Sequence, residues 1–356
     1  MSSEPGAGWQ RLSVLLVGCG SAGRRHARVL AGLGVERIRA FDPDPRQLGS
    51  LMEETPAVTP VGSLEEGLGA RPDAVFILTP PRLHIVQSIQ ALEAGCAVFS
   101  EKPLSDTSAG VPGLSALVER TGLSFMVGLC FRYHAGVLRA RELLKAGAIG
   151  RLVSVRALLG EHMPDMRPDY RSLFSARYSG AFDCMHDIDL AVWFADQPVR
   201  TVHAVSGTYS DIGIQAPDVV EILIDFADRR VASIHLDFFQ RPRRRSLELI
   251  GTDGVIILEF ASWDEYTLSH FSASEGAWHR VTAPTRRDDM FADEDRAFLV
   301  AVAGGPPVTC TIAEAVRSIE VVELAQRGGP GPEPQEDVPS GRHTGPAESD
   351  IAPGTV

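Results

Sequence analysis

Apolar residues form short strand-like runs in the first part of the chain, and segments of helical character separate them. The runs cover 12–17, 37–41, 73–78, 96–99 and 124–129. Between them lie helical segments at 24–33, 83–94 and 108–121. In the second of these segments the apolar residues recur along one helix face. Strands that alternate with helices predict a parallel sheet covered by helices, which is an α/β domain.

The pattern changes near residue 150. Strand-like stretches then follow one another at 151–159, 200–209, 218–226, 230–240, 245–251 and 254–260. Asp253-Gly254 is a dipeptide that typically joins antiparallel strands through a tight turn. These stretches predict a large, mostly antiparallel open sheet. Together with helices at 134–147, 289–304 and 311–327, they indicate an α+β domain.

The chain therefore divides into four segments. We expect a flexible N-terminus over 1–10, the α/β domain over 11–130, and an α+β domain for substrate binding and oligomerisation over 131–327. Residues 328–356 are rich in Gly, Pro, Glu and Ser with almost no apolar side chains, which predicts a disordered tail. The stretch 231–239 (VASIHLDFF) has much apolar surface for a strand in a sheet with one open face, so a homodimer or homotetramer is expected.

A glycine-rich turn follows the first strand directly. Gly18, Gly20 and Gly23 have the G-x-G-x-x-G spacing, and the turn opens a helix. The first glycine permits the tight turn, the second lets a pyrophosphate approach the backbone, and the third lets the helix pack against the strand. With Ser21 and Ala22, the turn predicts a Rossmann dinucleotide site in which the helix N-terminus binds the phosphates.

An acidic residue closes the second strand. Asp42 lies where a carboxylate accepts hydrogen bonds from the ribose hydroxyls of NAD and repels the 2′-phosphate of NADP. Arg46 is close in sequence and would favour that phosphate. NAD is therefore the expected cofactor, with NADP as the alternative.

Composition argues against several classes of partner. The formal net charge is −12, whereas nucleic-acid binding needs a basic surface. No apolar run reaches the roughly 18–20 residues that span a membrane, and residues 1–10 lack a signal pattern. The five cysteines are scattered without a C-x-x-C pair, which fits reduced thiols and a cytoplasmic location.

Several motifs together resemble one enzyme family. Residues 74–80 (AVFILTP) with His84, then 91–95 (ALEAG), lead to the triplet Glu101-Lys102-Pro103 at the end of a strand. This order is similar to that of the glucose–fructose oxidoreductase and inositol dehydrogenase family (Gfo/Idh/MocA), which carries an EKP motif. The resemblance continues to Leu324 through 131–134, 151–156 and 180–193. It implies an NAD-dependent oxidoreductase that acts on a CH–OH carbon of a sugar, sugar derivative or cyclitol, with sugar or secondary-metabolite biosynthesis as one setting.

Lys102 is the first candidate catalytic residue. It follows a strand at the carboxyl edge of the parallel sheet, where ligands bind in such folds. Its ammonium can hydrogen-bond a substrate hydroxyl and stabilise a developing alkoxide. In the family that the chain resembles, this lysine is catalytic.

Asp183 and His186 form a second candidate cluster. On a helix they would share one face, because positions i and i+3 superpose. His186 is a suitable proton acceptor near neutral pH, and Asp183 is expected to hold substrate hydroxyls. The family usually separates this pair by four residues, whereas the spacing here is three. The acidic residues around His186 lack the spacing of a metal site, so no metal is expected.

The resemblance implies further ligand contacts. For the cofactor they come, besides the glycine-rich turn and Asp42, from Thr79, Pro80, His84, Glu101 and Lys102. For a sugar-like substrate they come from Lys102, Arg132, Tyr133, Asp183 and His186.

The run 241–245 (RPRRR) is unusual in an acidic protein. A solvated turn accounts for most of these arginines, but Arg241 and Arg245 are candidates for binding an anionic substrate group such as a nucleotide diphosphate. Strand alternation places Arg243 and Arg245 on one face and Arg244 on the other.

Two alternative functions stay open. A sugar-nucleotide ketoreductase that uses NADPH would employ the same residues in reverse. A non-catalytic NAD-sensing regulatory protein would keep the fold without the chemistry. The presence of both Lys102 and His186 favours an enzyme.

Overall fold

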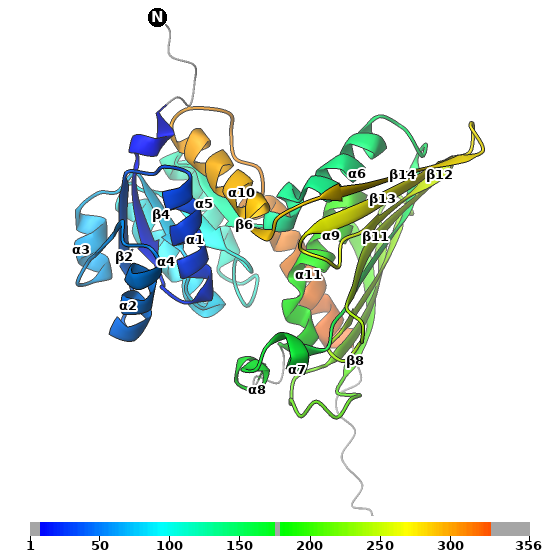
Figure 1. Cartoon of the computed structure of the whole chain (residues 1–356), viewed down its shortest axis with the longest axis horizontal. Coiled ribbons are helices and arrows are strands. Elements are labelled where there is room, and N and C mark those ends of the chain that lie inside the picture. The colour runs from blue at the N-terminus through cyan, green and yellow to red at the C-terminus, as the bar shows by residue number, and fades with distance from the viewer. Residues whose placement is uncertain (1–7, 175–178, 329–356) are drawn as a thin grey trace, which may run out of the picture.

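The structure is a computed structural model that describes residues 8–174 and 179–328. The predicted flexible N-terminus lies mostly outside these residues, and the predicted disordered tail lies outside them except for Gly328. Two sheets with their helices lie side by side, the N-terminal one on the left of Figure 1. Within the described ranges, no helix is long and apolar enough to cross a membrane.

The N-terminal sheet has six parallel strands in the order β3-β2-β1-β4-β5-β6. In that order they span Val58–Pro60, Arg37–Phe41, Ser13–Val17, Ala74–Ile77, Ala97–Glu101 and Phe125–Gly128. The helices around it are α1 (Ser21–Gly32), α2 (Pro45–Glu54), α3 (Leu64–Gly69), α4 (His84–Glu93) and α5 (Val111–Thr121). The predicted parallel Rossmann sheet is confirmed. Its strand order reverses between β1 and β4, where such sheets bind ligands at the carboxyl ends of the strands.

The central strands of this sheet are buried on both faces. Val14–Val17 of β1 and Ala74–Ile77 of β4 are almost inaccessible, as expected for strands with helices on both sides. Phe76 stacks on a neighbouring ring of β5, and Phe298 packs edge-on against Phe76 with 5.4 Å between the ring centroids. Phe298 belongs to α10 (Arg287–Val302), so a helix near the C-terminus completes the N-terminal core.

The C-terminal sheet has eight strands in the order β14-β13-β12-β11-β7-β10-β9-β8. In that order they span Ala277–Pro284, Glu265–Ser272, Gly254–Glu259, Arg244–Gly251, Leu152–Gly160, Val231–Asp237, Val219–Phe226 and Val199–Gly207. Every neighbouring pair is antiparallel except β7 with β10, which confirms the predicted mostly antiparallel sheet. The sequence pattern did not predict β13 and β14, because their side chains are mostly half-buried or exposed and lack an apolar alternation.

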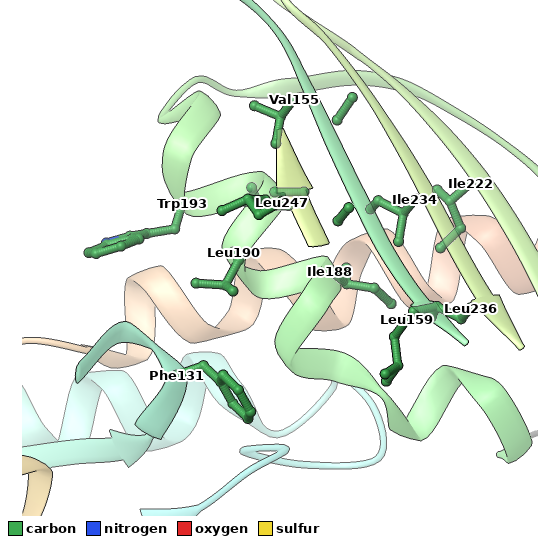
Figure 2. Close-up of a cluster of buried hydrophobic side chains, with 14 of the residues drawn as sticks. Phe131, Val155, Leu159, Ile188, Leu190, Trp193, Ile222, Ile234, Leu236 and Leu247 are labelled. Atoms are coloured by element: carbon green, nitrogen blue, oxygen red, sulfur yellow. The ribbon is translucent and has the colours of Figure 1, made fainter. Parts of the chain in front are cut away.

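Helices cover one face of this second sheet. They are α6 (Ala135–Lys145), α9 (Met185–Ala195) and α11 (Ile312–Gly328). Helix α9 packs on β7 and β10, α11 packs on β8, and α6 lies over β12 and β13. Figure 2 shows Ile188 of α9 beside Leu159 and Leu236 of the sheet. This packing fixes α9 and the segment before it at the side of the sheet that faces the N-terminal domain (Figure 1).

In the part of the chain that the structure describes, no helix lies over the opposite face of the C-terminal sheet (Figure 1). The sequence pattern placed the exposed apolar surface at 231–239, but this is wrong for Ile234, Leu236 and Phe238, which are buried under the helices. The outer face instead exposes Leu223, at 59%, together with Val205 and Trp278. Apolar side chains of this size on an open sheet are typical of a surface that is covered in the assembled protein.

We expect this outer face to pack against a second copy of the chain, which gives a dimer or tetramer. Leu223→Asp should shift the assembly toward monomer, because an unpaired charge in an apolar interface is costly. Light scattering at micromolar concentration measures this, with Val86→Asp on α4 as a control for a similarly exposed apolar residue elsewhere. A monomeric wild-type protein would contradict the prediction.

Candidate active site

A pocket of about 790 Å³ lies between the two domains. The N-terminal domain lines it with Ser21, Ala22, Arg25, Thr79, Glu101 and Lys102. The C-terminal part of the chain lines it with Glu161, Asp183, His186, Arg243, Arg245, Trp263 and Arg287. A second hollow of about 610 Å³, between β8 and α11, contains none of the predicted site residues. The pocket between the domains is therefore the candidate active site.

The glycine-rich turn joins β1 to α1, and its backbone leaves no room for side chains at two positions. Gly18 has a φ of +100°, and a Cβ there would lie 2.7 Å from the Leu78 carbonyl oxygen. A Cβ on Gly23 would lie 2.1 Å from the Gly18 carbonyl oxygen. Around Gly20, by contrast, a Cβ would meet nothing within 4 Å, and no side chain caps the start of α1. This open helix N-terminus fits a pyrophosphate.

Asp42 follows β2 and lies beside this turn. Its Oδ2 accepts a hydrogen bond from the Cys19 N–H at 2.7 Å, and its Oδ1 accepts one from the Asp44 N–H at 2.8 Å. Arg46 is highly exposed and pairs with Asp44 at 2.9 Å, so it does not neutralise Asp42. Among the described residues Asp42 forms no ion pair, so the turn carries a negative charge next to the open helix N-terminus.

Asp42→Ala is expected to lower the preference for NAD over NADP by about tenfold or more, because it removes a negative charge that repels the 2′-phosphate. The measurement is the ratio of kcat/KM for the two cofactors. Asp42→Asn is the matched variant, because it loses the charge but keeps an oxygen that accepts a backbone hydrogen bond. A similar loss of preference in Asp42→Asn would assign the effect to the charge. A wild-type preference for NADPH would show that this role of Asp42 is wrong.

Lys102 follows β5 and extends across the pocket toward the C-terminal domain. Its Nζ donates to the Asp183 backbone carbonyl at 3.3 Å, and its backbone N–H donates to Glu101 Oε2 at 2.6 Å. The ammonium thus contacts a neutral carbonyl at the segment that carries the second predicted cluster. The only other lysine in the chain is Lys145, which is exposed at the end of α6.

Asp183 and His186 come from two consecutive elements rather than from one helix. A 3-10 helix ends at Asp183, Cys184 is not helical, and α9 begins at Met185. The predicted common helix face is therefore wrong. Both side chains nevertheless line the pocket, because the turn at Cys184 places them along its wall.

The surroundings of these two residues set their protonation. Burial, followed by the charges of Lys102 and Arg245, lowers the pKa of His186 well below its usual range, so its imidazole is neutral at pH 7. Its Nδ1 is buried and has no hydrogen-bond partner among the described residues. The Asp183 side chain is exposed to the pocket. Loss of water around its carboxyl raises the pKa, and the positive charge of Lys102 opposes this shift.

A buried ionic network of His26, Glu101 and Asp295 supports the strand end that carries Lys102. His26 Nδ1 lies 2.9 Å from Asp295 Oδ1, and its Nε2 lies 3.9 Å from Glu101 Oε1. Burial alone would lower the pKa of His26, but the carboxylates of Asp295 and Glu101 outweigh it and raise the pKa to about 10. Because Glu101 also accepts from the Lys102 N–H, the network fixes the backbone at the lysine. Sequence reasoning missed Asp295, which is 269 residues away from His26.

Arg132 and Tyr133, which were predicted to contact substrate, do not line the pocket. Arg132 is buried and donates to both oxygens of Asp189, at 2.9 and 2.7 Å. Tyr133 shares a hydrogen bond of 2.6 Å with the Thr309 hydroxyl. Both side chains therefore join the segment after β6 to the C-terminal helices, and the predicted substrate contacts are corrected to packing roles.

His84 and Arg241 also depart from the predicted roles. His84 is buried, with Nε2 at 2.6 Å from the Thr79 carbonyl oxygen and Nδ1 at 2.7 Å from that of Pro103. It joins the loop of Thr79 and Pro80 to the loop after Lys102, and it does not line the pocket. Arg241 lies outside the pocket and pairs with Asp165 at 2.7 Å in solvent. Its predicted contact with an anionic substrate is corrected to a surface ion pair.

The predicted alternation of the arginine run is confirmed. Arg243 and Arg245 line the pocket, while Arg244 is exposed. Arg245 is buried and donates to both oxygens of Asp187, at 3.0 and 2.8 Å, so it holds the start of α9. Sequence reasoning missed Arg25, Glu161, Trp263 and Arg287 as pocket residues, because they come from segments that only the fold brings together.

Two family matches together cover most of the chain. Residues 12–129 match a family described as "Oxidoreductase family, NAD-binding Rossmann fold". Residues 137–257 match one described as "GFO/IDH/MocA C-terminal domain". The boundary between the two matches falls close to the end of the parallel sheet.

Individual proteins are similar over long stretches. The inositol 2-dehydrogenase of Acidothermus cellulolyticus is 27% identical over 68% of this chain and 71% of its own length. GenD2 from gentamicin A biosynthesis, solved in complex with NAD, is 26% identical with a TM-score of 0.74, over 89% of this chain and 94% of its own. Levoglucosan dehydrogenase in complex with NADH and levoglucosan has a TM-score of 0.79 at 22% identity, over 89% of this chain and 97% of its own, which shows the shared fold.

Proposed function

Since the chain belongs to the GFO/IDH/MocA oxidoreductase family, in which similar proteins are named inositol 2-dehydrogenase and levoglucosan dehydrogenase, we propose that it oxidises a ring carbinol at Lys102 and His186. The observation behind this proposal is that the side chains of Lys102 and His186 line the same pocket, next to the uncapped N-terminus of α1. The family, the NAD cofactor and the two-sheet fold predicted from the sequence are confirmed by the matches.

The geometry of the glycine-rich turn and of Asp42 fits NAD. The open backbone at Gly20 and the uncapped N–H groups of α1 would hold the pyrophosphate, and Asp42 would hold the adenosine ribose. The bound nicotinamide supplies the hydride acceptor. Thr79 and Glu101–Lys102 line the part of the pocket at the carboxyl ends of β4 and β5, so the ring would lie against them.

Lys102 stabilises the charge that develops on the substrate oxygen. As the carbinol loses its proton and its hydride, the oxygen passes through alkoxide character before it becomes a carbonyl. An ammonium in this partly desolvated pocket favours that charge more than water does. The ionic network behind Glu101 holds the lysine backbone still, so little reorganisation is needed at the reaction.

His186 accepts the hydroxyl proton. Its depressed pKa keeps the imidazole neutral, and a neutral ring nitrogen is the form that can take up a proton. The unpartnered buried Nδ1 is a site that a hydrogen-bonding group of a ligand would satisfy. Asp183 beside it is placed to hold a neighbouring hydroxyl, which fits the polyhydroxylated rings in the names of the relatives.

The test is the absorbance of NADH at 340 nm when the purified protein is mixed with NAD and a panel of inositols, aldoses and anhydrosugars. The proposal predicts NADH formation with at least one member, and loss of that rate in Lys102→Ala. Tight NAD binding without turnover on polyols, ketoses or sugar nucleotides in either direction would instead support a regulatory NAD sensor.

A further inference from the structure

Three arginines from separate segments lie over two aromatic rings at the pocket. Arg287 begins α10, Arg243 lies in the loop between β10 and β11, and Arg25 lies on α1. The guanidinium carbons of Arg287 and Arg243 are 4.3 and 4.9 Å from the centroid of Trp263. Arg25 stacks at 4.7 Å on Phe291, one turn further along α10. We call these three residues the arginine cluster, and all of them line the pocket that contains Lys102.

The positive charge of this cluster is not fully neutralised by the protein. Arg243 pairs with Glu161 at 2.8 Å, and Arg25 has a longer contact of 3.5 Å with Asp288, which is half-exposed. Arg287 forms no ion pair with any described residue. Burial, followed by the charge of Arg25, lowers the pKa of Arg287, while the nearby carboxylate of Asp288 opposes this shift. The protein as a whole carries −12, so this concentration of cations is local.

The aromatic contacts fix the orientation of the guanidinium groups. A guanidinium over the face of an aromatic ring is attracted to the ring and can still donate hydrogen bonds from its N–H edges. Such edges match the two oxygens of a carboxylate or phosphate. Arg243 already donates from Nε to Glu161 and from Nη1 to the Ala261 carbonyl oxygen, which leaves its Nη2 for a ligand. The cluster contains residues of both domains. An anion bound between them would therefore reduce the repulsion between the guanidinium groups across the pocket.

We propose that the arginine cluster binds an acidic group of the substrate, so that the enzyme acts on a sugar or cyclitol that carries a carboxylate or phosphate. This rests on the proposed function, since it assigns a substrate class to the same pocket. The same cluster would otherwise serve the pyrophosphate of the cofactor, and the experiment below separates these two sources of an anion.

The binding test uses the protein saturated with NADH. Glucuronate, glucose 6-phosphate and inorganic phosphate are titrated separately while tryptophan fluorescence is recorded. Trp263→Phe identifies the part of the signal that comes from the ring inside the cluster. At least one anion should bind, and Arg287→Ala should raise its Kd by about ten- to a hundredfold, as expected for loss of a charge-assisted contact.

Arg286→Ala is the matched control, because Arg286 is the neighbouring, highly exposed arginine, paired with Asp289 at 3.2 Å. It should leave the Kd of the anion within about twofold of wild type. The Kd of NADH, measured separately, should be unchanged in both variants. A parallel rise in the Kd of NADH in Arg287→Ala would assign the cluster to the cofactor and overturn the proposal.

Kinetics then separate this proposal from the function on which it rests. Oxidation of acidic sugars with a KM that rises in Arg287→Ala supports both. Efficient oxidation of neutral polyols alone, with an unchanged KM in Arg287→Ala, overturns the acidic substrate and leaves the dehydrogenase intact. If no tested anion binds to the wild-type protein, the proposal is also overturned, because the cluster then only joins the domains.

Discussion

Lys102→Ala should lower kcat by about a hundredfold or more while leaving the affinity for NADH nearly unchanged. The ammonium contacts a backbone carbonyl across the pocket and would stabilise the substrate oxygen mainly in the transition state. Removing such an interaction lowers kcat and kcat/KM together rather than raising KM alone. The glycine-rich turn and Asp42, which would hold the pyrophosphate and the adenosine ribose of the cofactor, are not touched by this substitution.

The chain offers a direct control for this prediction. Lys145 is the only other lysine, and it is exposed at the end of α6. Lys145→Ala should therefore keep wild-type turnover, and acetylation of the Lys145→Ala variant should inactivate it, because Lys102 is then the only lysine that can lose its charge. Turnover of Lys102→Ala within a few-fold of wild type would remove the catalytic role from this residue.

His186→Asn should lower kcat by about 10²- to 10⁴-fold, the usual range for loss of a general base. The variant keeps a polar group of similar size but has no basic nitrogen. His279→Asn, at an exposed position of β14 on the face opposite to Trp278, is the control and should be indistinguishable from wild type.

The pH dependence of kcat/KM provides a second test of the role of His186. A base must be neutral to act, and burial with the charges of Lys102 and Arg245 lowers the pKa of His186 well below 6.5. As pH falls, activity that depends on this base is lost only below that lowered pKa, so kcat/KM should not fall through His186 between pH 8 and 6.5. A wild-type acidic limb centred near 6.5 that disappears in His186→Asn would contradict the environment described for the imidazole.

The alternation of apolar runs was enough to predict the parallel sheet, because its strands are buried on both faces. Leu15 and Phe76 are completely buried, and such strands appear in the sequence as unbroken apolar runs. The last two strands of the second sheet were not predicted for the opposite reason. In β14 no residue is buried, so pairing with β13 is fixed by backbone hydrogen bonds and not by an apolar pattern.

The site could be predicted only where one motif carried both the residue and its position. Lys102 lies at a strand end within a recognisable triplet, and the structure places it in the pocket. Arg132 had the same standing in the sequence as a substrate-binding candidate. Its partner Asp189 is 57 residues away, and the choice of partner depends on the packing of α9. Arg287 was missed because nothing near it in sequence indicates that Trp263 and Arg25 lie beside it.

Transfer of deuterium tests the central claim most directly. NADH with deuterium at both C4 positions of the nicotinamide is mixed with the protein and the keto form of whichever polyol the absorbance panel selects, and the product is analysed by mass spectrometry. We predict that wild-type protein gives a product with a single deuterium on the newly formed carbinol carbon, and that Lys102→Ala gives almost none in the same time. Product without deuterium, or equal labelling by Lys102→Ala, would contradict hydride transfer at this pocket.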